Sequence, residues 1–287
     1  MSKYEKKSSM VFTYLFLSLF ALLCLLPFWY VITISFSNPS LVREGEIHLL
    51  PVGFNLKAYQ VILREKTFYN SFKVSVFRTL VGSALAITVQ SMFAFAVSRR
   101  HMVCRRLLKR MVLFAVLFNG GIIPTFLVVC DTHLFDTIWA LIIPVAFSPW
   151  NVIILTSFFE SLPVSLEESA RIDGANDLQI FGRICLPLST ASIATILLFI
   201  AVSHWNNLMD GVIYINSSRL KPLQVYLNDM VMRTQMQDMF ADAGDMELPT
   251  LSIQTAAIFA STVPILVVYP FVQRYFVKGV MIGAVKG

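Results

Sequence analysis

Six long apolar runs constrain the fold of this 287-residue chain more than any other feature of its sequence. About twenty apolar residues are enough to cross the hydrocarbon core of a bilayer as one α-helix. Hydrophobic residues make up 56% of the chain and charged residues only 14%, too little charge for a soluble domain. The sequence therefore predicts an all-α integral membrane protein with six transmembrane helices, at about residues 10–34, 72–97, 111–130, 137–157, 188–203 and 251–271.

The basic residues predict the orientation of these spans. The densest group lies at residues 99–110, between the second and third runs, and the N-terminal segment and the C-terminal tail are also basic. Because cytoplasmic loops of membrane proteins are enriched in Lys and Arg, both termini are expected in the cytoplasm. A nucleic-acid-binding patch at 99–110 and a cleaved signal peptide at the first run are the alternatives, and both explain the pattern less well.

A polar segment at residues 165–187 interrupts the apolar runs and has the pattern of two short helices. Ser165 followed by Glu168 is a capping-box pattern, and Asn176 followed by Gln179 is a weaker second one. Gly174 lies where the first helix should end in a left-handed residue.

Two further features of the segment concern charge and helix entry. Glu167 and Arg171 are spaced as an i, i+4 ion pair with the acid first. Pro187 suits the first turn of the following helix, where its missing N–H costs little.

The spacing within this segment is specific. Glu168-Ser169-Ala170, three residues, Gly174, nine residues and then Ile184-Cys185-Leu186-Pro187 resembles the EAA loop of ABC importer permeases, with Ser169 as the one departure. Pro51-Val52-Gly53-Phe54, the IIPT run at 122–125 and the ending FVKGVMIGAVKG are similar to the carbohydrate-uptake class of these permeases, the class of the smaller maltose-transporter permease.

The resemblance implies a type I ABC importer permease fold in a multi-pass subunit of the bacterial plasma membrane. It also implies these partners: a second related permease, two ATPase subunits that bind ATP and Mg, an extracellular solute-binding protein, membrane lipid and a carbohydrate substrate, most naturally an oligosaccharide. A non-sugar solute such as a polyamine or phosphate is the alternative. The chain lacks a G-x-x-x-x-G-K-[ST] phosphate loop, so ATP hydrolysis is expected in a partner chain, with no cofactor on this one.

In permeases of this family the EAA loop docks on the ATPase subunit. By resemblance, the residues expected to couple this chain to an ATPase are Glu168, Ser169, Ala170 and Gly174. Leu166 and Phe181 are apolar candidates for the same contact, and packing against the chain's own spans is an equal alternative for both.

Candidates for the sugar pathway are polar or aromatic residues in or near the spans. Amides hydrogen-bond to sugar hydroxyls, and aromatic rings pack against the C–H surfaces of sugar rings. A charge or amide within a span also needs a protein or water partner. Trp205 is alternatively an interfacial aromatic and Asn151 an inter-helix hydrogen-bonding residue. The candidates are Arg78, Asn119, Trp150, Asn151, Trp205 and Asn206.

Other functions fit the sequence poorly. None of the predicted spans carries two acidic residues, and the four Cys and four His are scattered, so neither a catalytic cluster nor a metal site is expected. No nucleic-acid partner is expected. The predicted divisions are an N-terminal span with an outer segment (1–71), the transmembrane domain (72–276) with its cytoplasmic loop (158–187), and a cytoplasmic tail (277–287).

Overall fold

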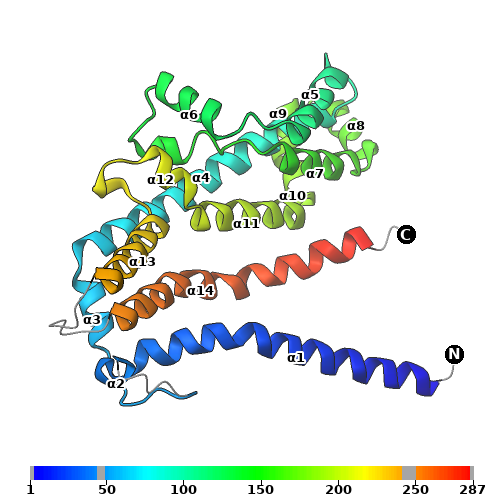
Figure 1. The fold of residues 1–287 in the computed structure, drawn as a ribbon. Helices are drawn as coiled ribbons and strands as arrows, with labels where there is room; N and C mark the ends of the chain where they lie inside the picture. The colour runs from blue at the N-terminus through cyan, green and yellow to red at the C-terminus, as the bar shows by residue number, and fades with distance from the viewer. Residues whose placement is uncertain (1–2, 44–48, 241–249, 285–287) are drawn as a thin grey trace. The chain divides into compact units, whose positions relative to one another are not determined.

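The computed structural model describes residues 3–43, 49–240 and 250–284, which are mostly α-helical and contain no β-strand (Figure 1). The all-α prediction is confirmed for these residues. A helix is one of the few structures that satisfies its own backbone hydrogen bonds in a bilayer. The chain divides into two compact units, Met1–Phe68 with Leu227–Val263 and Tyr69–Tyr226 with Pro264–Gly287.

The first unit is organised around an aromatic cluster at the end of its longest helix. The Phe36 ring stacks on Tyr59 with centroids 5.0 Å apart and meets Phe259 edge-on at 5.8 Å. The Tyr59 hydroxyl donates to Ser35 Oγ at 2.8 Å. The unit contains α1 (Lys3–Phe36), α2 (Pro39–Arg43), α3 (Lys57–Arg64), most of α13 (Leu223–Phe240) and the first part of α14 (Thr250–Ala284).

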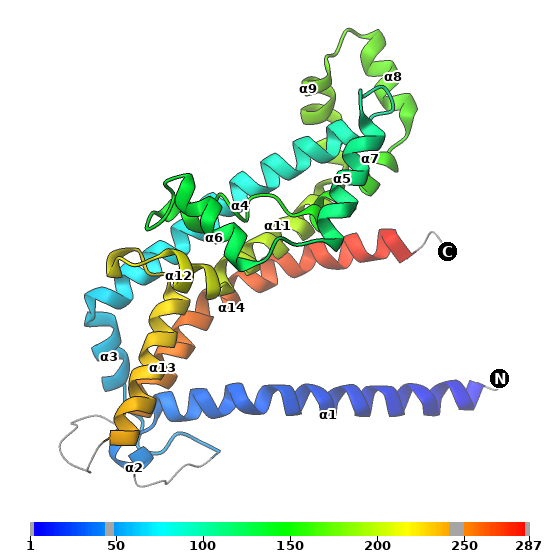
Figure 2. The ribbon, with the colours of Figure 1, turned by 45° about the horizontal axis from the view of Figure 1, so that its top comes forward.

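The second unit is built along α4 (Lys66–Ser98), a continuous helix of 33 residues. In Figures 1 and 2, α8 and α9 lie at one end of α4, beside the start of α5. The helices that follow α4 are α5 (Arg105–Leu117), α6 (Ile122–Asp131), η1 (Ile138–Leu141), α7 (Pro149–Glu160), α8 (Val164–Ile172), α9 (Asp177–Ile180), the π-turn η2 (Phe181–Cys185), α10 (Leu186–Leu188), α11 (Thr190–Asn206), α12 (Met209–Tyr214) and η3 (Ser218–Leu220).

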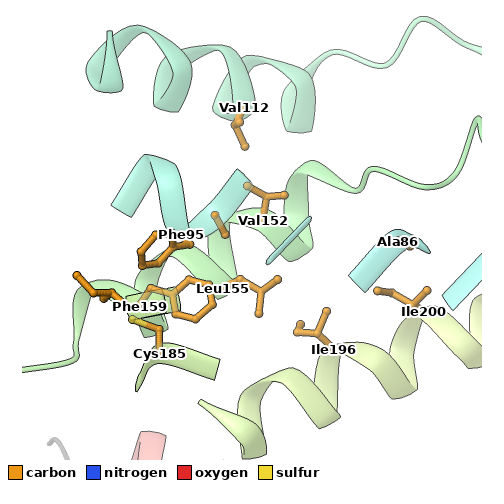
Figure 3. Packing of buried hydrophobic residues seen from close by; sticks show 11 residues of the cluster. Ala86, Phe95, Val112, Val152, Leu155, Phe159, Cys185, Ile196 and Ile200 are labelled. Atoms are coloured by element: carbon orange, nitrogen blue, oxygen red, sulfur yellow. The ribbon is translucent and has the colours of Figure 1, made fainter. Parts of the chain in front are cut away.

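The hydrophobic core of this unit lies where α4, α5, α7 and α11 meet (Figure 3). The rings of Phe95 and Phe159 meet edge-on at 6.2 Å, and Phe181 lies 5.1 Å from Phe95. A smaller cluster of Val129, Ala140 and Tyr214 joins α6, η1 and α12. The labelled core residues in Figure 3 are Ala86, Phe95, Val112, Val152, Leu155, Phe159, Cys185, Ile196 and Ile200.

The predicted number of six spans is not confirmed by the described residues. Among the described residues, three helices are long and apolar enough to cross a membrane: Met10–Phe36, Lys66–Ser98 and Leu251–Val268. Two pairs pass the same test only as bent spans: α5 with α6, bent by 117°, and the stretch Asp177–Leu188 (α9, η2 and α10) with α11, bent by 85°. By length and composition, the described residues thus contain three candidate spans, or up to five if each bent pair counts as one.

The predicted fourth span, residues 137–157, is not one helix. It contains the short η1 and then α7, whose 12 residues reach only about 18 Å, less than the roughly 30 Å hydrocarbon core. Pro144 and Pro149 lie at the interruption, and Ser148 caps α7 by accepting from the Asn151 N–H. Gly120 and Gly121 separate α5 from α6 in the same way.

Candidate functional site

The segment that the sequence analysis singled out forms a helical hairpin, α8 followed by α9 (residues 164–180, the α8–α9 hairpin). α8 begins at Val164 with Pro163 at its N-cap, so Ser165 lies inside the first turn and caps nothing. The capping box predicted for Ser165 and Glu168 is therefore wrong. The extended backbone of Pro163 starts the helix earlier than Ser165 could.

The turn between the two helices follows the prediction. Gly174 has φ +83°, the left-handed conformation that favours glycine. The Gly174 N–H donates to the Arg171 carbonyl at 3.1 Å, and the Ala175 N–H donates to the Ala170 carbonyl at 2.9 Å. These two bonds form a Schellman motif and satisfy carbonyls at the end of α8.

The start of α9 also follows the prediction. The Asn176 side chain accepts from the Gln179 N–H, and the Gln179 side chain accepts from the Asn176 N–H, both at 2.9 Å. Pro187 lies in the first turn of α10, as expected.

Glu167 is the buried acidic residue of α8, and it forms an ion pair with Arg99 at the end of α4. The predicted pair with Arg171 is wrong, because the Arg171 guanidinium instead binds Asp177 at 2.5 Å. The cation that pairs with Glu167 is Arg99, 68 positions earlier in the sequence. Helix spacing predicts only local pairs and cannot reveal this one.

Arg99 joins several elements at this point. Its Nη2 donates to the Phe159 carbonyl at 3.3 Å, its Nε donates to Ser98 Oγ at 3.0 Å, and its guanidinium lies 4.6 Å from the centroid of the Phe95 ring. Burial lowers the pKa of Arg99 from its ordinary value, because the cation loses water. Arg99 therefore connects α4, α7 and α8.

The opposite face of the hairpin is exposed. Val164, Glu168 and Ile172 are spaced four residues apart and so share one face of α8, and Ile172 is 86% exposed. Leu178 of α9 is 69% exposed. The sequence analysis missed Ile172 and Leu178, although an apolar residue between Arg171 and Asp173 on a polar helix is a usable signal.

The other predicted coupling residues lie in different surroundings. Ser169 and Gly174 are exposed, Leu166 is 43% exposed, and Ala170 is half-buried against the core. Phe181 packs on Phe95 and Phe159, so it contacts the chain's own core.

A second charged cluster lies beside the hairpin. Glu160 at the end of α7 binds Arg105 at 2.5 Å and also Lys109, both from α5. Burial raises the pKa of Glu160, but the hydrogen bonds from Lys109 and Arg105 outweigh it, and the net pKa lies below the ordinary value.

At the other half of α4, Arg78 forms a buried ion pair with Asp210 of α12. Arg78 Nη1 also donates to the Asn207 carbonyl at 3.3 Å, and the Asn207 amide donates to the Asp210 carboxylate at 3.0 Å. An acidic partner is one of the two surroundings expected for an arginine within a span.

Arg78 and Asn151 line a common cavity of about 210 Å³ between α4, α7 and α11, called here the polar pocket. The sequence analysis missed its other polar residues, which include Gln90, Ser148, His204 and Asn207. A Cβ on Gly82 would lie 2.6 Å from the His204 ring, so glycine at 82 gives that ring its space.

The remaining pathway candidates do not line the polar pocket. Trp205 is buried and meets Phe72 edge-on at 6.0 Å. Trp150 is 62% exposed, Asn206 is exposed, and Asn119 is exposed and accepts from the Gly121 N–H at 3.0 Å. Among the described residues no group of His, Cys, Asp or Glu could hold a metal ion.

Comparisons with known proteins cover almost the whole chain. The family model described as "Binding-protein-dependent transport system inner membrane component" matches residues 2–282. The polygalacturonan/rhamnogalacturonan transport system permease protein YtcP of Bacillus subtilis is 46% identical over 276 residues, 96% of each chain. Protein LplC of the same organism is 43% identical over 277 residues, 95% of this chain and 93% of that protein.

A solved structure is also similar. A chain of a bacterial ABC transporter involved in the import of the acidic polysaccharide alginate superposes with a TM-score of 0.86 and 32% sequence identity. The match covers 96% of this chain and 99% of that one.

Proposed function

Because this chain belongs to the family of inner membrane components of binding-protein-dependent transport systems, we propose that it is a permease subunit that imports a carbohydrate. The relatives support a sugar over a polyamine or phosphate, since YtcP is named for polygalacturonan and rhamnogalacturonan and the solved neighbour for alginate. A further similar protein, AraQ of Bacillus subtilis, is named for arabinooligosaccharides, which favours an oligosaccharide as the substrate.

The α8–α9 hairpin is the observation that carries this proposal. Its inner face is attached to the core by Glu167 and Arg99, while its outer face presents Glu168, Ile172 and Leu178. A short helix fixed on one side and exposed on the other is suited to receive a partner's movement. We therefore assign the docking of an ATPase subunit to this outer face.

The proposed mechanism uses these contacts. Two ATPase subunits hold ATP and Mg and close on binding them, and this chain supplies no phosphate loop of its own. The movement of the hairpin then reaches α4 and α7 through Arg99, which contacts both. A second permease completes the pathway, and a solute-binding protein delivers the sugar outside.

The test is growth and uptake in a deletion strain, across neutral and acidic oligosaccharides, with copurification of partner subunits. We expect loss of uptake of one class of oligosaccharide and an ATPase that copurifies with this chain. Unchanged uptake of all sugars together with loss of polyamine or phosphate uptake would refute the carbohydrate assignment.

A further inference from the structure

The polar pocket contains buried polar atoms without partners. Gln90 Oε1, His204 Nδ1 and Arg78 Nε have no hydrogen-bond partner among the described residues. Gln90 and Arg78 are fully buried and His204 is 4% exposed. The Gln90 amide nitrogen donates to the Ala146 carbonyl at 2.9 Å, which fixes the orientation of its free oxygen.

Such atoms indicate an occupant. A buried polar atom without a hydrogen bond costs about 1–3 kcal/mol, and three of them lie around one cavity. The cavity volume, about 210 Å³, is well above the roughly 10–15 Å³ that one water needs. The pocket can therefore receive a group much larger than a single water.

The charge and chemistry of the lining favour a neutral, hydroxylated group. The positive charge of Arg78 is balanced by Asp210, so the pocket carries no free charge to attract a carboxylate. Gln90 and Asn151 offer both donors and acceptors, and a hydroxyl group can serve as either. Phe199, 48% exposed, adds an apolar ring to the same lining.

We propose that the polar pocket binds one hydroxylated ring of the transported carbohydrate, through its hydroxyl groups. This inference rests on the proposed import of a carbohydrate and adds a binding site within this chain. Gln90, Asn151 and Arg78 Nε contact the hydroxyls, and Phe199 covers a face of the ring.

The first experiment measures access to the pocket in the reconstituted complex with its binding protein. Ser203 lines the pocket and Asn206 on the same helix does not, and both residues are exposed. In a background with the native cysteines replaced by serine, Ser203→Cys and Asn206→Cys are labelled with a thiosulfonate reagent. Tetragalacturonate and maltotetraose are the sugar probes.

We expect the transported probe to slow labelling at position 203 at least threefold and to leave position 206 unchanged. Equal labelling with and without sugar, while uptake proceeds, overturns the pocket and leaves the proposed function intact. If the parental complex takes up no oligosaccharide at all, the proposed function fails and the pocket fails with it.

The second experiment measures uptake at saturating loaded binding protein. Gln90→Leu removes a hydrogen-bonding group from the pocket, so we expect a three- to tenfold lower uptake rate per ATP hydrolysed. Ser83→Ala is the matched control, because Ser83 Oγ is also buried and unpaired on α4 but does not line the pocket. Its uptake should equal that of the parent.

Asn151→Ala is the second variant, in case Gln90→Leu does not fold. It also removes an amide from the pocket, and Asn151 is 9% exposed whereas Gln90 is fully buried. It should lower uptake by a similar factor, with normal copurification of the ATPase. Parental uptake per ATP in the folded variants would overturn the assignment.

Discussion

One buried arginine lies within α4 and another directly follows its last residue, and the two arginines differ in what they connect. Arg78 and Arg99 are 21 positions apart, about 32 Å along a helix, which is close to the hydrocarbon thickness of a bilayer. Each pairs with a carboxylate distant in sequence, Asp210 or Glu167. One buried ion pair therefore lies toward each end of the longest helix of the second unit.

The contacts around the two ion pairs indicate different roles for Arg78 and Arg99. Arg78 is held by Asp210 and Asn207, lines the polar pocket, and has an Nε without a hydrogen-bond partner among the described residues. Arg99 has contacts to a carbonyl of α7, an aromatic ring of α4 and Glu167 of α8. The first arrangement lines a cavity, and the second attaches the exposed α8–α9 hairpin to the core.

The sharpest test of this comparison is whether the two ends face opposite sides of the membrane. Cysteines placed at Thr132 and Ser217 should react with a membrane-impermeant reagent in intact cells, and a cysteine at Ser161 should react only after the cells are opened. This all-or-none pattern follows from the excess of basic residues near the Arg99 end. The reverse pattern would place the termini outside.

The second test breaks each ion pair. Arg78→Leu and Arg99→Leu each leave a buried carboxylate unpaired, so each should destabilise the purified protein by about 3–5 kcal/mol. The double variants Arg78→Leu/Asp210→Leu and Arg99→Leu/Glu167→Leu should recover most of that stability. Thermal unfolding in detergent measures these differences.

Transport then separates the two pairs. The double variant at Arg99 and Glu167 should be stable but hydrolyse ATP without moving sugar, because α8 has lost its attachment to α4. The double variant at Arg78 and Asp210 should still copurify with the ATPase and should lower sugar uptake only about three- to tenfold, as the other pocket variants do, without abolishing it. Identical phenotypes for the two double variants would show that the Arg78–Asp210 and Arg99–Glu167 pairs do not have different roles in transport.

The burial and pairing of Arg78 are easier to predict from the sequence than those of Arg99. Arg78 stands alone in an apolar run, so its need for a partner is visible. Arg99 lies in a run of basic residues, and its burial cannot be distinguished from the exposure of Arg100. Its partner Glu167 was assigned to Arg171, because helix spacing shows local neighbours and not the long-range contacts that decide burial.

Local structure was predictable for the same reason. The turn at Gly174 and the capping box at Asn176 depend on residues only a few positions apart, and both are present. The box at Ser165 failed because Pro163 begins the helix earlier. Pro149 and Gly121 mark helix breaks that can be recognised in the sequence. The bend at each break depends on packing, and the number of candidate spans depends on these bends.

The third test concerns the turn of the hairpin. Gly174→Val places a branched side chain at φ +83°, which should cost roughly 1–2 kcal/mol in the hairpin conformation. A Cβ there meets no atom within 4 Å, so the effect is on the backbone and on docking. ATPase pull-down should fall about five- to thirtyfold, since 1.4 kcal/mol is a factor of ten.

Gly182→Ala is the matched control, because its Cβ also has open space and its φ is not positive. It should bind the ATPase as the parent does. Equal pull-down by Gly174→Val and Gly182→Ala would mean that the shape of this turn does not matter for docking.

The fourth test concerns the exposed charge of α8. Glu168 makes no capping interaction, so Glu168→Ala should leave membrane insertion and thermal stability unchanged. If Glu168 meets a base of the ATPase, its loss should weaken binding by about 1 kcal/mol, roughly fivefold. Titrated pull-down measures the change, and Asp173→Asn, another exposed acid of the hairpin, should not reproduce it.

The smallest expected effect is at Glu160, whose ion pairs join α7 to α5. Its pKa in the folded protein lies below the ordinary 4.5, so its charge stabilises the fold above pH 4.5. That contribution is lost as the pH falls through the lowered pKa. Because the side chain is 33% exposed, solvent screening limits the contribution at pH 7 to about 1 kcal/mol or less.

Glu160→Gln should therefore lower the melting temperature slightly at pH 7, and the difference from the parent should shrink progressively below pH 4.5. The measurement is thermal unfolding of both proteins across that pH range. Because Glu160 lies beside the hairpin but does not attach it, sugar moved per ATP should stay unchanged in this variant. A loss of coupling there as large as that from breaking the Arg99–Glu167 pair would mean that the whole charged cluster at this end of α4 transmits the movement, and that Arg99 has no special part in it.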